Sequence, residues 1–153
     1  MTTKPALIGG GLFFEDFTVG YRFRTRGRTV TETDLVSFVN LAWFTEELFT
    51  NMEEREGMLL QGRVVPGALV YSYAEGLLMP SIQDNGLAFL GAEIKIPAPT
   101  FVGDTIHVEC EVIMARPSSK LGRGVVQTMN KVTKQTGEVV LTYNPSRLIK
   151  VRP

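Results

Sequence analysis

A single strongly apolar helical segment, followed by a long run of strand-like segments, constrains the fold of this chain most. Pro66 stands where the first turn of the helix is expected, and Pro80 is expected to end it. Apolar residues occupy most sides of the segment, so we expect other elements to enclose the helix. Small residues such as Gly67 and Gly76 leave room for a sheet to approach it closely.

The second half of the chain predicts consecutive antiparallel strands. The candidate strands cover residues 86–96, 104–114, 125–134 and 138–151. Residues 104–114 alternate strictly, which places positions 106, 108, 110, 112 and 114 on one face of a sheet. The short segment 135–137 between the last two strands, which ends in glycine, predicts a hairpin.

The first half adds a strand and shorter helices. Residues 1–12 are expected to form a flexible arm before a single domain over residues 13–153, and residues 21–30 alternate as a strand does. Thr31 and the acidic residues after it are typical of a capped helix start, and a second short helix is expected near Thr45. This order of elements predicts an α+β hotdog fold, in which an antiparallel sheet wraps around one long buried helix.

Composition excludes several classes of function. Lys and Arg total 16, as do Asp and Glu, so the formal net charge is zero and no overall field attracts nucleic acid or an anionic membrane. One cysteine and one histidine provide no metal-binding cluster, and a single thiol fits a reducing compartment. No stretch approaches the roughly 20 apolar residues of a membrane span. We therefore expect a cytoplasmic protein without a metal.

Three segments, taken together and in order, resemble the MaoC-like dehydratases. They are Phe14-Glu15-Asp16-Phe17 with the following Gly20, Pro66-Gly67-Ala68-Leu69 with the following Ser72, and Pro99-Thr100-Phe101-Val102-Gly103-Asp104. The resemblance covers roughly residues 13–150. It implies a hotdog domain that acts on thioesters of coenzyme A or of a carrier protein and needs no other cofactor. It also implies a dimer whose site lies between two subunits.

The catalytic loop of the family departs from its pattern in this chain. The family carries Asp-x-Asn-Pro-x-His there, and its central helix usually starts with His-Gly. In the matching loop, Phe44 takes the Asp position and Phe49 the His position, while Glu46 replaces the Asn and Glu47 the Pro. The helix begins with Pro66 instead of histidine. The usual acid–base pair is therefore missing.

Two positions are the leading catalytic candidates. In the family, the amide that matches Gly67 polarises the thioester carbonyl, and a helix N-terminus offers unpaired N–H groups for this purpose. Glu46 lies between the two lost acid–base positions, where aromatic neighbours could raise the pKa of its carboxyl group. The alternative is that Thr45, Glu46 and Glu47 only start a short helix. Glu47 is the runner-up to Glu46.

Aromatic residues of the same loop are candidates for substrate binding. Trp43, Phe44 and Phe49 could form an apolar acyl pocket, or could simply pack in the core. Ser72 belongs to the segment that resembles the central helix of the family, and it joins this substrate-binding set.

Other polar residues have more ordinary interpretations. Glu75 interrupts the apolar helix and is a second runner-up, because some hotdog thioesterases use a helix carboxylate. His107 is expected on the polar face of its strand, and Cys110 is expected to be a small core residue. Asp104 is expected to cap a turn.

Three functional hypotheses follow. The first is a hydratase or dehydratase relative that binds enoyl or 3-hydroxyacyl thioesters with an altered acid–base group. The second is a hotdog thioesterase that uses Glu75. The third is a non-catalytic chain that binds an acyl thioester or supports an active hotdog subunit. We expect a homodimer with residues 43–51 near the partner, or a heterodimer with an active subunit.

Overall fold

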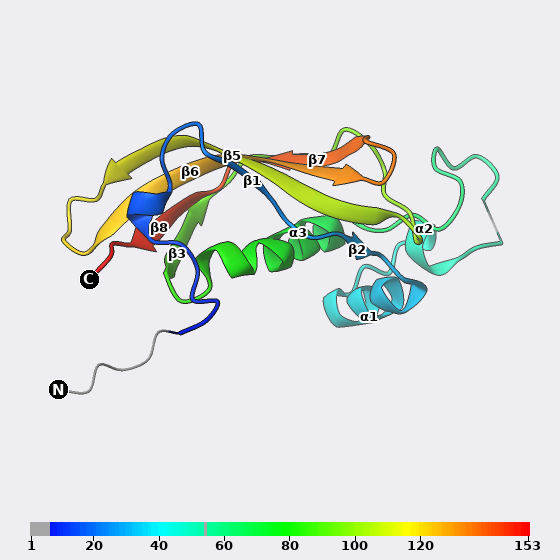
Figure 1. Ribbon diagram of the computed structural model, residues 1–153. Coiled ribbons are helices and arrows are strands. Elements are labelled where there is room, and N and C mark those ends of the chain that lie inside the picture. Colours follow the sequence, from blue (N-terminus) through cyan, green and yellow to red (C-terminus); the bar gives the residue numbers. More distant parts are fainter. Residues whose placement is uncertain (1–6, 54) are drawn as a thin grey trace.

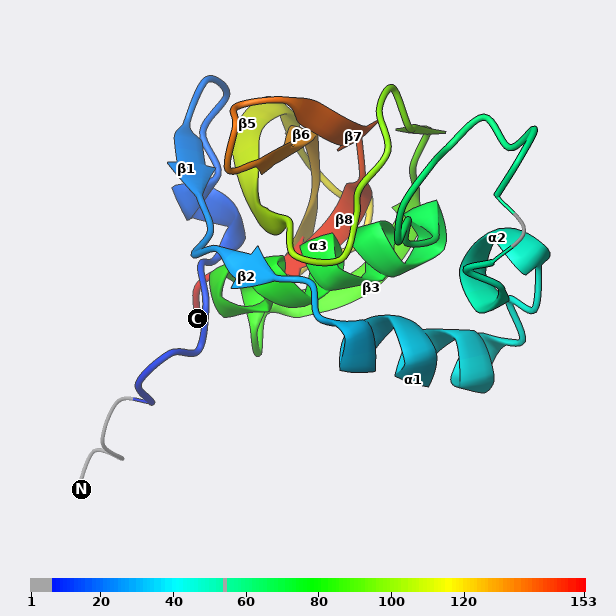
Figure 2. The same cartoon turned by 90° about the vertical axis from the view of Figure 1, so that its right-hand side faces the viewer.

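The computed structural model describes residues 7–53 and 55–153 (Figure 1). One long helix lies across an antiparallel sheet, and two shorter helices lie beside one end of it (Figures 1 and 2). The elements are η1 (Phe14–Asp16), β1 (Arg22–Arg24), β2 (Arg28–Thr29), α1 (Glu32–Ala42), α2 (Glu47–Thr50), α3 (Gly67–Ile82), β3 (Gly86–Gly91), β4 (Ile94–Lys95), β5 (Thr105–Pro117), β6 (Arg123–Lys134), β7 (Val139–Tyr143) and β8 (Ser146–Lys150).

The sheet is built around the long β5–β6 hairpin. Both β1 and β2 pair with β5 along one edge. On the other side of β6, β7 pairs with one half of the strand and β8 with the other half. The short strands β4 and β3 continue the sheet beyond β7 and β8, respectively. Every pairing is antiparallel, as the hotdog prediction requires.

Helix α3 packs on the sheet along one of its sides. Its buried residues recur at helical spacing and include Leu69, Ala74 and Leu78. Ala68 and Ser72 on the opposite side are exposed. The expectation that other elements enclose the helix is therefore wrong for this side of α3 within one chain, because the sheet meets the opposite side, which carries the buried apolar residues.

Helix α3 is longer than predicted. It continues through Pro80 to Ile82, so the expectation that Pro80 ends it is wrong. A proline inside a helix loses one hydrogen bond and crowds the carbonyl group four residues earlier, which here belongs to Gly76. Both Pro80 and Gly76 are exposed, so water can reach this carbonyl group. We infer that this exposure lets the helix tolerate the proline.

Several predicted strands are interrupted. The segment 21–30 forms β1 and β2, residues 86–96 form β3 and β4, and residues 138–151 form β7 and β8. Strand β5 keeps the predicted alternation up to Val112, and Ile106, Val108 and Cys110 are buried with it. The prediction that Met114 shares this face is wrong, because a register shift after Val112 places Ala115 in the core instead.

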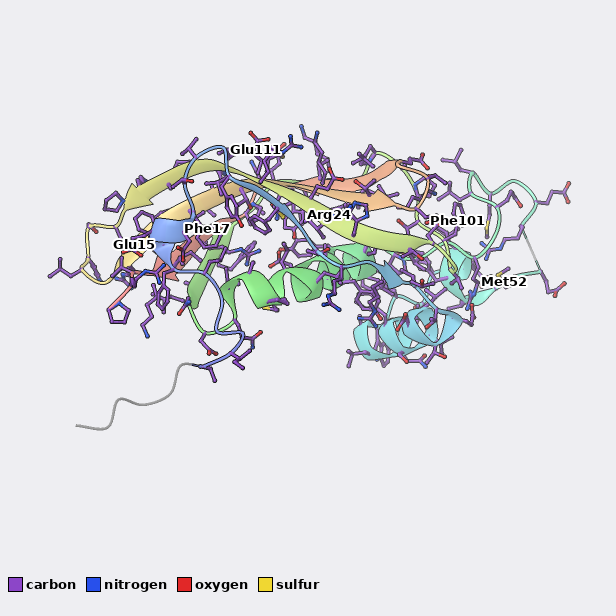
Figure 3. All side chains as sticks on the ribbon, in the orientation of Figure 1. Glu15, Phe17, Arg24, Met52, Phe101 and Glu111 are labelled. Atoms are coloured by element: carbon purple, nitrogen blue, oxygen red, sulfur yellow. The ribbon has the colours of Figure 1, made fainter. Side chains whose placement is uncertain are left out.

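The two faces of the sheet differ in the way that the alternation predicts. Phe17 lies on the side that faces α3, whereas Glu111 stands on the opposite, outer face (Figure 3). The predicted hairpin over 135–137 is confirmed, since the amide of Gly137 donates to the Lys134 carbonyl and Gly137 has a φ of 87°.

The helix starts agree with the sequence in one case and differ in the other. Thr31 caps α1 as predicted, and its hydroxyl accepts from the amide of Asp34 at 3.1 Å. The cap position of α2 is Glu46, not Thr45. In the predicted arm, residues 1–6 lie outside the described residues, whereas Gly10, Gly11 and Leu12 bond to residues at the end of α3 and just beyond it.

Candidate functional site

An apolar cavity of about 190 Å³ lies at the N-terminal end of α3. The loops before and after the helix, together with β7, bring distant parts of the sequence together around it. Its lining residues are Leu48, Phe49, Leu60, Val64, Val65, Gly67, Val70, Ile96, Ala98, Pro99, Thr100 and Val140. None of these twelve residues has a titratable side chain.

The first turn of α3, which lines this cavity through Gly67, contains unpaired amides. Pro66 has no N–H, and its carbonyl accepts from the amides of Leu69 and Val70. The amides of Gly67 and Ala68 donate to no described residue. Unpaired N–H groups and the helix dipole make this end of α3 attractive to a carbonyl oxygen that gains negative charge.

Ile96 lies directly over Gly67. A Cβ atom added to Gly67 would meet the Cδ1 atom of Ile96 at 2.3 Å. Ile96 nevertheless keeps 56% of its surface exposed. Glycine at position 67 therefore allows this close approach, and Ile96 is the exposed side chain at the edge of the cavity.

The structure separates the three aromatic residues of the preceding loop. Phe49 is buried and lines the cavity. Phe44 packs between Phe38 and Phe49, with ring centroids 5.5 and 6.4 Å apart. Trp43 ends α1 in the left-handed conformation, with a φ of 62°, and is 82% exposed. The loop thus delivers one aromatic side chain to the cavity and supports it with a second.

The two glutamates of the loop face solvent. Glu46 precedes the first residue of α2, and its carboxylate has no hydrogen bond or ion pair with a described residue. Glu47 accepts a hydrogen bond from the side chain of Asn51 at 2.8 Å. Glu46 is thus the more available of the two carboxylates, although neither lines the cavity.

An arginine fixes the α2 segment that carries Phe49. Arg63 makes a fork of hydrogen bonds to Glu32 at the start of α1 and also donates to the Phe49 carbonyl. The hydrogen bond from Arg63 lowers the pKa of the Glu32 carboxyl group. The guanidinium is thereby committed to positioning the loop.

Glu75 is held in a polar cluster between α3 and the sheet. It accepts hydrogen bonds from the hydroxyl of Tyr143, at 2.8 Å, and from Arg147. Only 18% of the Glu75 side chain and 14% of the Arg147 side chain are exposed. Burial, with the nearby Glu75 charge, raises the pKa of the Tyr143 hydroxyl. The carboxylate of Glu75 is therefore a structural partner within one chain.

The remaining candidate side chains have hydrogen-bonding or packing roles in the fold. Ser72 is exposed, and its hydroxyl donates to the Ala68 carbonyl at 2.8 Å. His107 lies on the outer face beside Glu109, and buried Cys110 is a core residue, both as predicted. Burial raises the pKa of the Cys110 thiol to about 12. Such a thiol is protonated at neutral pH and is a poor nucleophile.

Asp104 caps the turn before β5, as predicted. It accepts from the Phe101 amide at 2.9 Å and from the Gln135 side chain at 2.8 Å, and Lys134 lies 3.4 Å away. Burial tends to raise the pKa of Asp104, but these hydrogen bonds and the Lys134 charge outweigh it and lower the pKa. The carboxylate thereby joins this turn to the β6–β7 hairpin.

The sequence predictions missed most of the cavity wall. Ile96, Thr100 and Val140 lie far from Gly67 along the chain and meet it only in the fold. The sequence offered one signal for the missed wall. Two apolar residues, Val64 and Val65, stand directly before Pro66, and such a pair indicates that the chain is buried where it enters the helix. Among the residues that the structure describes, no three His, Cys, Asp or Glu side chains converge on a metal position. No helix in the same residues is long and apolar enough to span a membrane.

Two curated proteins are similar to this chain. The mesaconyl-CoA hydratase of Cereibacter sphaeroides is 30% identical over 135 residues, which cover 87% of this chain and 39% of that protein. The chain thus spans about two fifths of that relative. The (R)-specific enoyl-CoA hydratase of Rhodospirillum rubrum is 21% identical over 92% of this chain and 93% of its own length. No family model matches the chain.

Solved structures share both the fold and the sequence pattern. A monoamine oxidase regulatory protein from Archaeoglobus superposes with a TM-score of 0.84 and 32% identity, over 94% of this chain and 97% of its own. A MaoC-like dehydratase from Rhodospirillum rubrum gives a TM-score of 0.84 and 28% identity, over 94% and 99% of the two chains. With the hotdog architecture and the glycine-started central helix, these similarities show that the chain belongs to the MaoC-like hotdog family of hydratases and dehydratases.

Proposed function

We propose that this chain binds an acyl thioester at the N-terminal end of α3. The carbonyl oxygen would accept from the Gly67 amide, and the acyl group would enter the adjacent cavity. The observation that carries this proposal is the combination of unpaired amides with an apolar cavity of about 190 Å³ at one helix end. Such a site combines a donor for the oxygen with room for the carbon chain.

The proposed reaction is the reversible hydration of a 2-enoyl thioester. Water adds its oxygen to the β-carbon, a proton is delivered to the α-carbon, and the Gly67 amide stabilises the enolate oxygen in between. The curated relatives are named as hydratases of CoA thioesters, which supports this reaction class. One carboxylate could take the proton from water and return it to carbon, and we propose Glu46 for this role.

Substitution to glutamine tests the role of Glu46. Because Glu46 is exposed and its carboxylate bonds to no described residue, Glu46→Gln should leave the melting temperature unchanged. If Glu46 is the acid–base group, hydration should fall by about 100-fold or more. Glu47→Gln is the matched control and should retain most of the rate. Normal turnover by Glu46→Gln would remove Glu46 from the mechanism.

A second candidate function is that of a binding subunit beside an active hotdog chain. The observation that favours it is the cavity lining, in which none of the twelve residues has a titratable side chain. A partner chain with the usual Asp and His pair would then supply the proton transfer. This candidate predicts acyl-CoA binding without turnover by the isolated chain.

Association of two chains forms part of the proposal. All six residues of β3 are exposed, and within residues 7–53 and 55–153 β3 pairs only with β8, which leaves an open apolar edge that contains Leu87, Phe89 and Leu90. Such edges are usually paired or covered. We expect a symmetric dimer through this edge, and light scattering at micromolar concentration tests it. A Phe89→Lys variant should be shifted toward the monomer, and a monomeric native chain would contradict the proposal.

One screen separates the functional candidates. The purified chain is incubated with enoyl-CoA, 3-hydroxyacyl-CoA and saturated acyl-CoA compounds, and the products are separated by chromatography. Hydration of the enoyl compound supports the hydratase proposal, whereas release of free CoA supports the thioesterase alternative. Binding without a product supports the subunit role. Absence of binding to every compound would overturn the proposed function.

A further inference from the structure

The cavity at Gly67 also limits which acyl group can enter. Among the residues that the structure describes, no lysine, arginine or histidine lines it, and Thr100 is its only polar lining residue. Val70 and Val140, which form its inner wall, are 3% and 1% exposed. A carboxylate at the far end of an acyl group would therefore be desolvated without a cation to compensate it.

The nearest arginine in the sequence cannot supply that cation without loss elsewhere. Arg63 precedes Val64 of the cavity wall, but its guanidinium is bound to the Glu32 carboxylate and to the Phe49 carbonyl. Moving it toward a ligand would release the segment that carries Phe49, which is itself a wall of the cavity. Arg55 donates to the carbonyl of the lining residue Leu48 at 3.0 Å but does not itself line the cavity. The arrangement thus disfavours a charged acyl end.

The volume indicates how much of an acyl chain the cavity can enclose. An apolar cavity of about 150 Å³ can hold one benzene, which has six carbons. By the same ratio, about 190 Å³ holds roughly six to eight carbons. The exposed side chain of Ile96 marks the edge where the chain would enter, and Val70 and Val140 close the inner side.

We infer that the site selects an uncharged acyl group of up to about eight carbons, with Val70 as a length-determining residue. This inference rests on the proposed function, because it assumes that the cavity receives the acyl group of a thioester. It sets this chain apart from the similar mesaconyl-CoA hydratase, whose named substrate carries a free carboxylate in addition to the thioester.

Calorimetry with a series of saturated acyl-CoA compounds tests the inference. Affinity should rise by about fourfold for each methylene from butanoyl-CoA until the cavity is full, and should fall for dodecanoyl- and hexadecanoyl-CoA. Butanoyl-CoA and succinyl-CoA form a matched pair, since each has four carbons and only succinyl-CoA ends in a carboxylate. Succinyl-CoA should bind at least tenfold more weakly.

Val70→Phe tests the wall directly, because the larger ring would project into the cavity. The variant should lower the affinity for octanoyl-CoA at least tenfold and the affinity for butanoyl-CoA less than threefold. Val36→Phe, the same substitution on the exposed side of α1, should change neither, and circular dichroism of both variants checks the fold. If Val70→Phe unfolds, the comparison of butanoyl-CoA with succinyl-CoA on the native chain still tests whether the site prefers an uncharged acyl group.

The outcomes separate the two levels of the proposal. Equal affinity for butanoyl- and succinyl-CoA, or undiminished affinity for hexadecanoyl-CoA, would leave thioester binding intact and overturn the substrate class. Failure of every acyl-CoA to bind would instead overturn the proposed function, and the inference with it.

Discussion

The two halves of the α3–sheet interface have opposite chemistry. At the N-terminal end, Gly67 adjoins an apolar cavity of about 190 Å³ with unpaired amides. Further along, Glu75 and Arg147 form a compact polar cluster, and the cavity beside Arg147 and Asn130 measures only about 20 Å³. Of these two cavities, the larger one has no titratable side chain in its lining, and the smaller one lies beside the arginine that pairs with the helix carboxylate. A carboxylate in an apolar helix is therefore not sufficient evidence of a catalytic site.

The largest effect is expected at Gly67. Gly67→Val would place a branched side chain between the helix end and Ile96, and would block the approach of a carbonyl oxygen. Acyl-CoA affinity should fall by about 100-fold or more, comparable to the loss of one donor from an oxyanion hole. Calorimetric titration measures this change.

A double variant separates blocked access from a disturbed fold. Ile96→Ala removes the atom that a new side chain at Gly67 would meet first. Gly67→Val combined with Ile96→Ala should therefore fold as the native chain does but still fail to bind. Native affinity in either Gly67 variant would remove this helix end from the site.

Substitution in the polar cluster should lower the free energy of unfolding and leave acyl-CoA binding almost unchanged. Glu75→Gln leaves Arg147 with an uncompensated charge in a largely buried position, and should cost about 3 kcal/mol of unfolding free energy in urea denaturation. Acyl-CoA affinity should change less than threefold. The matched control is Glu93→Gln, at the exposed pair with Lys95, which should cost less than about 0.5 kcal/mol.

The thioesterase alternative makes the opposite prediction for the same variant. It requires Glu75→Gln to abolish release of free CoA at unchanged stability. A stable Glu75→Gln protein that has lost thioester hydrolysis would reverse the comparison and place the chemistry in the polar cluster.

Asp104 should make stability depend on acid pH. Its folded-state pKa is lowered, so its contribution is present above the ordinary carboxyl pKa and is lost as the pH falls through the lowered folded-state value. Asp104→Asn should cost about 1–3 kcal/mol at pH 7 and should flatten the decline in acid. Urea denaturation at pH 7 and at successively lower pH measures both effects, and an unchanged acid decline would exclude Asp104 as its cause.

The smallest expected effect lies at Trp43. Its left-handed backbone is unfavourable for any residue with a Cβ atom, and its exposed ring loses little packing when removed. Trp43→Gly should therefore stabilise the fold by up to about 1 kcal/mol, as measured by circular dichroism during urea denaturation. Trp43→Ala retains the Cβ atom and should show no such gain.

The sequence predicted the features that depend on local pattern. The Thr31 cap, the alternation through Val112 and the Asp104 turn follow from residues within a few positions of one another. The helix end at Pro80 was wrong because solvent exposure of the Gly76 carbonyl is a property of the fold.

The candidate site was predicted only in part. Gly67 and Phe49 were identified from the family pattern, and both line the cavity. Trp43 was expected at the pocket but is exposed. Its own backbone adopts the left-handed conformation, which no local sequence signal predicts. Ile96 and Val140 could not be assigned, because strand pairing between β4 and β7 brings their neighbourhood to the helix.

The outward position of Trp43 also gives the protein a built-in optical probe. The chain contains one tryptophan, and it lies 82% exposed on the loop that leads to Phe49. An exposed indole emits at long wavelength, and its emission moves toward the blue when a ligand or a second subunit covers it. Fluorescence of the native chain can therefore report, without a label, whether Trp43 is covered, and its dependence on protein concentration would distinguish a partner chain from a bound thioester.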